Sequence, residues 1–598
     1  MLLCLGLATW AQDGRGSTPL MQAVAFGTPE SVESLLAGGA SVDARNAFDA
    51  TALIWGAADE RKARLLIAKG ADVNAHSRLG RTPLMIAAAC DGCSSVVRLL
   101  LSKSADPKAT ATDGVTALWL AAAAGDTESM RLLLNAGADA NAASHAGITP
   151  LMEALTNCDP DAVQLLLAHH ADVHPATTSG VTAMHYAAPY CTVDVVRTLL
   201  EAGADANARD IRQMTPLMLA VASEIQDAAV VRVLIHAGAD VTAKSQAGET
   251  ALDWARKYGN KDVLSQLTAA GAWAPEIPAP PAHRRQKPLG AAAAVATATA
   301  LLERSSTQFF KQSGCVGCHH QPMTLAAVAA ARGAGVPVDE AAARELGRMI
   351  ESEWIGVQEE LLERFDPGGL ADGESYSAWA LALNHYPAGP IADTVAVHVA
   401  TLQHRDGHWH VGDASHSPIE ESDIARTARA LYTLQQYAPA GRRTEFAARI
   451  ARARDWLAEA LPVTTDDAGM QIAGLTWAGA PREQVSTLAS KLIAAQRPDG
   501  GWAQNLNLPG DALATGEALW ALREGHALQP ADPVYRRGVD YLLATQWDDG
   551  SWRVPSRAPK IQPYFESGFP FGHDQWISAA GASWAVMALA PAIPKGGR

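Results

Sequence analysis

The segment at residues 314–323, GCVGCHHQPM, combines the residue types that could do the most chemistry in this chain. Cys315 and Cys318 are separated by two residues, and His319 and His320 follow directly. Thiolate sulfur and imidazole nitrogen at this spacing suit tetrahedral coordination of zinc or iron. The same two thiols could instead form a short disulfide that closes a turn.

The C-x-x-C-H pattern resembles the attachment motif of c-type cytochromes. That resemblance implies haem c held by thioether bonds to Cys315 and Cys318, with His319 as the proximal iron ligand. Such attachment takes place outside the cytoplasm, so it predicts an exported protein. The sixth ligand stays open among His408, His410, His416, His573 and Met349.

Two other interpretations of this segment remain open. A zinc or iron site without haem would draw its ligands from the two thiols and from His319, His320, His408, His410, His416 and His573. In addition, Cys318 and Gln321 have a C-x-x-Q-x-M spacing that resembles the internal thioester of complement and alpha-macroglobulin proteins. That resemblance implies an acyl bond between these two side chains, near the start of an α/α toroid.

The elements around this segment are helical. Apolar residues recur at helical spacing in residues 291–310, 340–365 and 422–437. Three loops between helices repeat one pattern, with Gln six residues before Trp and Asp-Gly between them. We expect the Asp-Gly turn to end a helix, the Trp to cap that end and the Gln amide to bind neighbouring backbone. The loops are Gln403–Trp409, Gln496–Trp502 and Gln546–Trp552.

These loops resemble the QW motifs of the squalene–hopene cyclase and protein prenyltransferase superfamily. The resemblance covers residues 291–592 and implies an (α/α)6 toroid around a cavity for an apolar or isoprenoid ligand. Residues 464–470, TTDDAGM, resemble the acid motif of class II terpene cyclases, with Asp466 as the acid and Asp467 as its neighbour. Thr464 replaces the first Asp of that motif. The alternative is that the threonines cap a helix and both aspartates complement its dipole.

The first half of the chain repeats at a period of about 33 residues. Each unit begins with Thr, at Thr18, Thr51, Thr82, Thr116, Thr149, Thr182, Thr215 and Thr250. Thr caps a first helix, a second apolar helix follows, and Gly with Asp or Asn makes the turn. The units resemble ankyrin repeats over residues 14–272, which implies eight repeats and a concave face that binds a protein partner.

The other cysteines and the chain's composition limit the function further. Cys90 and Cys93 could form a local disulfide in an exported protein, whereas we expect Cys158 and Cys191 to be small buried residues. The net charge is −15, and acidic residues outnumber basic ones on both sides of residue 272, so we expect no nucleic-acid binding. No apolar run is long enough for a transmembrane span.

The sequence therefore predicts an all-α protein in four parts. Residues 1–13 are a signal-peptide remnant or a buried first helix, and residues 14–272 are the ankyrin array. Residues 273–290 are a proline-rich linker, and residues 291–592 form the toroid. The expected location is periplasmic or secreted, with the cytoplasm as alternative. Four functions stay open: a haem c protein with an apolar ligand, a cyclase-like enzyme using Asp466, a non-catalytic scaffold and a thioester domain.

Overall fold

The computed structural model describes residues 15–275, 288–313, 316–317, 320–364, 370–410, 422–559 and 566–594. Across these ranges the fold is all-helical, as predicted. The one pair of strands in them is short and antiparallel, β1 (Trp502–Ala503) and β2 (Gly510–Asp511). None of the helices in the described ranges combines the length and hydropathy needed to cross a bilayer. The expected signal remnant and residues 276–287 of the expected linker lie outside the described residues.

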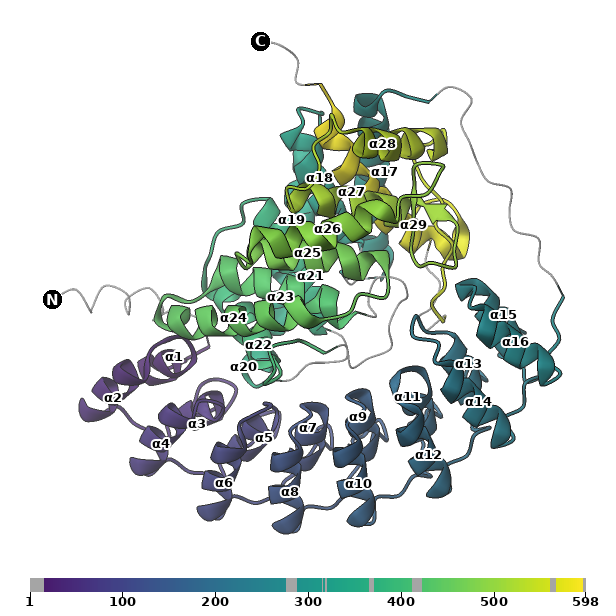
Figure 1. Ribbon diagram of the computed structural model, residues 1–598. Coiled ribbons are helices and arrows are strands. Elements are labelled where there is room, and N and C mark those ends of the chain that lie inside the picture. The colour runs from purple at the N-terminus through teal and green to yellow at the C-terminus, as the bar shows by residue number, and fades with distance from the viewer. Residues whose placement is uncertain are drawn as a thin grey trace.

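The N-terminal part is an arc of helix pairs (Figure 1). Every first helix of a pair begins after one of the eight predicted threonines, which is its N-cap. The first helices form one row, in which each packs on the next: α1 (Pro19–Phe26), α3 (Ala52–Gly56), α5 (Pro83–Ala88), α7 (Ala117–Ala123), α9 (Pro150–Thr156), α11 (Ala183–Tyr190), α13 (Pro216–Val221) and α15 (Ala251–Tyr258).

The second helices form a parallel row on the outer side of the arc. Gly70 and Gly137, which follow two of them, have φ angles of 86° and 92°, so these turns use the left-handed conformation that glycine adopts at little cost. The outer row is α2 (Pro29–Ala37), α4 (Glu60–Ala68), α6 (Ser94–Ser102), α8 (Thr127–Asn135), α10 (Pro160–Ala168), α12 (Val193–Glu201), α14 (Ala228–His236) and α16 (Lys261–Ala269).

Both disulfides of the described chain lie in this arc. Cys90 and Cys93 are joined, as the sequence allowed. Cys158 and Cys191 are joined as well, so the prediction that they are separate core residues was wrong. Their Cα atoms are 5.0 Å apart, because the two cysteines are 33 residues apart and occupy the same position in adjacent repeats.

Six helices of the C-terminal part contact one another in a closed order, which we call the inner circuit. In that order they are α18 (Gln321–Gly333), α21 (Leu370–Leu383), α23 (Asp423–Tyr437), α25 (Thr465–Trp477), α27 (Ala512–Glu524) and α29 (Gln575–Leu589). Each packs on the next, and α29 packs on α18.

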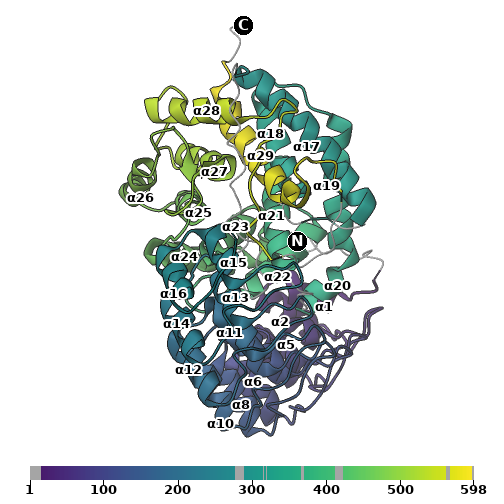
Figure 2. The ribbon, with the colours of Figure 1, turned by 90° about the vertical axis from the view of Figure 1, so that its right-hand side faces the viewer.

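Further helices pack on the outside of the inner circuit (Figure 2). They are α17 (Ala291–Ser313), α19 (Glu340–Gly356), α22 (Pro390–Thr401), α24 (Arg443–Glu459), α26 (Arg482–Ala494) and α28 (Pro533–Thr545), with the short α20 (Gln358–Leu362) against α22. The helix expected at 340–365 is therefore interrupted at Val357. Short 3₁₀ turns are η1 (Ala440–Arg442), η2 (Gly572–Asp574) and η3 (Ala590–Ala592).

The Gln–Trp loops tie these outer helices together, which confirms the predicted hydrogen bonding. Each Trp indole donates to a carbonyl near the end of the preceding helix, at 2.6–2.9 Å. Each Gln amide donates to the Gly carbonyl of its own loop and to a carbonyl of another helix. The second acceptors are Arg449 in α24, Val534 in α28 and, for Gln546, Ala294 in α17. The Gln546 loop is therefore hydrogen-bonded to α17, the first helix of the C-terminal part.

The inner row of the arc faces the C-terminal helices along much of its length (Figure 1). Contacts come from the carboxyl ends of the inner helices and from the loops between repeats. They include the hydrogen bonds Ser77–Glu363 at 2.6 Å, Asn46–Glu359 at 2.9 Å and Arg405–Asp91 at 2.8 Å, and a buried ion pair between Arg557 and Glu224. The two parts thus form one packed assembly.

Candidate functional site

The two aspartates of the TTDDAGM segment have different surroundings. Thr464 is the N-cap of α25, and Asp467 completes its capping box. The Asp467 carboxylate accepts hydrogen bonds from the backbone nitrogens of Val463 and Thr464, at 2.8 and 2.9 Å, and from the Ser422 hydroxyl. Asp467 therefore holds the helix end, as the capping alternative predicted.

Asp466 takes no part in that cap. It is 5% exposed, and its Oδ2 atom has no hydrogen-bond partner in the described structure. Burial raises the pKa of Asp466 to about 7, with the charge of Arg429 opposing the shift and that of Asp467 adding to it. A carboxyl with this pKa is partly protonated near neutral pH, and its protonated form is able to donate a proton.

Glu517 and Arg429 complete a buried charged cluster with Asp466. Glu517 lies in α27, and its pKa is raised well above the ordinary value by burial and by the nearby charges of Asp466 and Asp511. Arg429 lies in α23, with its guanidinium 3.7 Å from the centroid of the Tyr376 ring. Two carboxyls in one buried region cannot both ionise cheaply, so the ionisation of one opposes the ionisation of the other.

Sequence analysis missed Glu517 and Arg429 because neither belongs to a spaced motif. The available signal was a charged side chain inside an apolar helix, as in ALATGEALWAL for Glu517. Asp511 has a different role: it is the N-cap of α27, and its carboxylate accepts a hydrogen bond from the backbone nitrogen of Ala514.

Aromatic side chains gather in the second half of the inner helices. Trp379, Trp520 and Trp584 contact one another with ring centroids 5.0–5.8 Å apart. Trp477 bridges from Trp520 to Tyr432. Since all five lie in the second half of α21, α23, α25, α27 or α29, these helices run in the same direction. Arg429 and Glu517 lie three residues before Tyr432 and Trp520 on the same helices, so the charged cluster is about one turn from the aromatic side chains, toward the amino ends.

The GCVGCHHQPM segment joins α17 to α18. Cys315, Cys318 and His319 lie outside the described residues, so the geometry of a haem, metal or thioester bond there is open. His320 is buried and stacks on Phe309 with ring centroids 5.1 Å apart. Gln321 begins α18, and its side-chain oxygen accepts a hydrogen bond from the Gly317 nitrogen at 2.8 Å.

The other candidate ligands are distributed over the C-terminal part. His408 and His410 lie together at the boundary with the array, and Asp423, which the sequence analysis did not single out, joins them. Burial and the charges of His408 and His410 lower the pKa of the adjacent His404 to about 3. The remaining candidates are apart: His416 is outside the described residues, His573 is exposed in η2, and Met349 is buried in α19.

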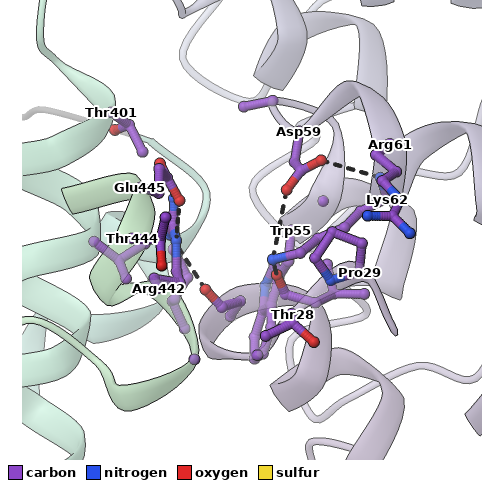
Figure 3. A pocket seen from close by; sticks show the side chains of 18 of the residues that line it. Thr28, Pro29, Trp55, Asp59, Arg61, Lys62, Thr401, Arg442, Thr444 and Glu445 are labelled. Atoms are coloured by element: carbon purple, nitrogen blue, oxygen red, sulfur yellow. Dashed lines mark hydrogen bonds and ion pairs between the residues drawn. The ribbon is translucent and has the colours of Figure 1, made fainter. Parts of the chain in front are cut away.

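A cavity of about 530 Å³ lies between the start of the array and the C-terminal helices (Figure 3). Lys62 reaches across its wall to donate to the Val24 carbonyl at 2.8 Å, and burial lowers the pKa of Lys62 to about 8. On the opposite wall, Arg442 pairs with Glu445 at 2.8 Å and donates to the Ala25 carbonyl. The lining therefore mixes charges that largely pair among themselves.

Comparison with known proteins addresses the N-terminal part. A family model described as "Ankyrin repeats (3 copies)" matches residues 20–113, 84–177, 118–210 and 157–245. No curated protein matches the chain. Ankyrin repeats suggest a protein-interaction role, and here the inner row of the array packs on the C-terminal helices of the same chain. The N-terminal region is an ankyrin-repeat array.

Proposed function

We propose that residues 291–592 form an α/α toroid similar to that of squalene cyclases, and that Asp466 protonates an apolar, isoprenoid-like substrate within it. The observation that carries the proposal is the buried carboxyl of Asp466 beside Glu517 and Arg429, whose pKa is raised to about 7, so that a substantial fraction of it is protonated near neutral pH. The closed order of the six inner helices and the return of Gln546 to α17 support the toroid.

The chemistry follows from the charged cluster and the aromatic side chains of the inner circuit. Asp466 gives its proton to a carbon–carbon double bond, and the electron pair of that bond forms the new carbon–hydrogen bond. Arg429 stabilises the carboxylate that remains. The carbocation then loses a proton from a neighbouring carbon to solvent, and the Asp466 carboxylate regains one. In this proposal the carbocation is stabilised by the negative ring potential of the tryptophans that contact one another nearby, Trp379, Trp477, Trp520 and Trp584.

The test uses the full-length chain with squalene or geranylgeraniol in detergent micelles, in D₂O. We expect a rearranged product that carries one solvent-derived deuterium, and no product from Asp466→Asn. Asp532→Asn, at the partly buried N-cap aspartate of α28, is the matched control and should keep wild-type turnover. Equal turnover of Asp466→Asn, or no deuterated product from either polyprene, contradicts the proposal.

A second candidate function is export with covalent haem c on Cys315 and Cys318. The two disulfides of the array favour it, because disulfides persist in the oxidising compartments where haem c is attached. Expression into the periplasm of a host that matures haem c should give a haem-sized mass gain and a Soret band that survives denaturation. An unchanged intact mass contradicts this candidate, and a loss of one ammonia would indicate the Cys318–Gln321 thioester instead.

A further inference from the structure

We propose that His408, His410 and Asp423 bind a divalent transition-metal ion, with the ligand chemistry of zinc, at the boundary between the ankyrin array and the C-terminal helices. The three side chains are partly buried, and one ligand atom from each lies within 4.8 Å of the other two. His410 Nδ1 is 3.1 Å and His408 Nε2 is 3.9 Å from the same oxygen, Asp423 Oδ2.

These separations fit a metal with small adjustments. Zinc bonds nitrogen and oxygen ligands at about 2.0–2.1 Å, which places tetrahedral ligand atoms about 3.4 Å apart. Two histidines and one carboxylate leave a fourth position for water. The backbone of Asp423 is fixed because it lies in the first turn of α23, directly after the Ser422 N-cap.

The second nitrogen of each imidazole is already held. His408 Nδ1 is 2.6 Å from the Asp406 carboxylate, and His410 Nε2 is 2.6 Å from the Thr156 carbonyl oxygen. Both partners are acceptors, so these two nitrogens carry the hydrogens. A neutral imidazole then directs its other nitrogen, with a lone pair, at Asp423. A cation bound between these lone pairs and the carboxylate would remove their mutual repulsion, and this outer arrangement is typical of metal-binding histidines.

The surroundings favour a cation and give it access. A cavity of about 470 Å³ reaches His408, and its wall carries the acidic side chains of Asp91, Asp126, Glu128 and Asp406. His404 also faces this cavity and stacks on His408 with ring centroids 4.5 Å apart. Asp91 and Asp126 belong to the array, so both parts of the chain surround the approach to the site.

A metal here would connect the two parts of the molecule. His410 contacts Thr156, the last residue of α9 in the array, while Asp423 begins α23 of the inner circuit. An ion bound to both His410 and Asp423 would fix the His410 imidazole, which is hydrogen-bonded to Thr156 of the array. We therefore infer that the ion stabilises the packing of repeat five on the C-terminal helices.

The full-length chain, freed of metal with a chelator and then dialysed, is titrated with Zn²⁺ against a chromophoric competitor. We expect one site that is lost in His408→Gln, His410→Gln and Asp423→Asn. Asp406→Asn, which removes the outer partner of His408, should weaken binding by about 10–100-fold. His174→Gln is the matched control, because His174 is also 2.7 Å from a carboxylate, that of Asp172, but has no second histidine.

A Cys315→Ser/Cys318→Ser variant shows whether the zinc is bound by the two thiols instead. We expect this variant to keep the zinc site. Hydrogen exchange provides a second readout: Zn²⁺ should slow exchange of the amides near Thr156 in the wild type and not in Asp423→Asn. Unchanged zinc affinity in the three ligand variants, or loss confined to the cysteine variant, overturns the proposal. Either result would leave a protonated His410 paired with Asp423 as the explanation of the geometry.

Discussion

At the scale of single residues, neighbouring aspartates of one motif have opposite roles. Asp467 is satisfied by backbone nitrogens at the start of α25 and stabilises the fold. Asp466, one residue earlier, is buried beside Glu517 and lacks a partner for one oxygen in the described structure. Such a carboxyl costs stability when it ionises, which is typical of a residue kept for chemistry.

We expect Asp466→Asn and Asp467→Asn to change the free energy of unfolding in opposite directions at pH 8. The folded pKa of Asp466, about 7, lies above its ordinary value of 3.8, so its ionisation destabilises the fold increasingly from about pH 4 to pH 7. Removing it should add about 1–3 kcal/mol at pH 8 and little at pH 4. Losing the Asp467 cap should cost about 1 kcal/mol. Urea unfolding at both pH values measures this, and equal effects of the two variants would contradict it.

At the scale of elements, a disulfide and side-chain hydrogen bonds between neighbouring repeats or helices stabilise the structure. Cys158–Cys191 joins repeats five and six, and the Gln–Trp loops join successive outer helices. The loop bonds were predictable because they depend on a local pattern of Gln, Asp-Gly and Trp. The second disulfide was not predicted, although its cysteines share one offset in adjacent repeats, because the distance between neighbouring repeats at that offset, 5.0 Å between the Cα atoms, comes from the tertiary packing.

Reduction of the Cys158–Cys191 disulfide should destabilise the array. It closes a loop with a sequence separation of 33 residues, for which chain entropy predicts a loss of about 3–4 kcal/mol. The Cys90–Cys93 disulfide closes a separation of only three residues and should contribute less. Thermal unfolding of Cys158→Ser/Cys191→Ser and Cys90→Ser/Cys93→Ser measures both, and a larger loss for the second pair would refute the argument.

Gln546→Leu should destabilise the C-terminal part more than Gln496→Leu does. The Gln546 amide is fully buried and donates to the carbonyls of Ala294 and Gly550, each at 3.0 Å. Leucine leaves both carbonyls without this donor, at a cost of about 2–4 kcal/mol. Gln496 is only half-buried, so water can replace part of its bonding. Chemical denaturation ranks the two variants, and hydrogen exchange in α17 should rise only for Gln546→Leu.

At the scale of the whole molecule, the array and the C-terminal helices meet through buried polar groups. The array's existence follows from the period of its threonines. Asn46 and Ser77 follow the same period, five residues before Thr51 and Thr82. Their partners Glu359 and Glu363 belong to no repeat, so the surface that the array packs against does not follow from the period. The same applies to the cluster of Asp466, Glu517 and Arg429, whose members lie on three helices and meet only through the tertiary fold.

The packing of the two parts should weaken as pH rises. Burial raises the pKa of Glu363 to about 8 from its ordinary 4.5, although the Ser77 hydrogen bond and Arg81 oppose the shift. Because the folded pKa is raised, the penalty of ionisation is absent below about pH 4.5 and complete above pH 8. Glu363→Gln should remove this part of the dependence. Hydrogen exchange of the loop around Ser77 between pH 5 and 9, corrected for intrinsic rates, measures it, and an unchanged slope in Glu363→Gln would contradict it.

The bond from Gln546 to Ala294 has a consequence for synthesis on the ribosome. The array can form repeat by repeat as it emerges, since each unit needs only its neighbours. By contrast, α17 packs on α29, so its surface stays exposed until almost the whole chain has been translated. The array is then complete while the inner helices are still arriving, and it provides the surface on which they assemble.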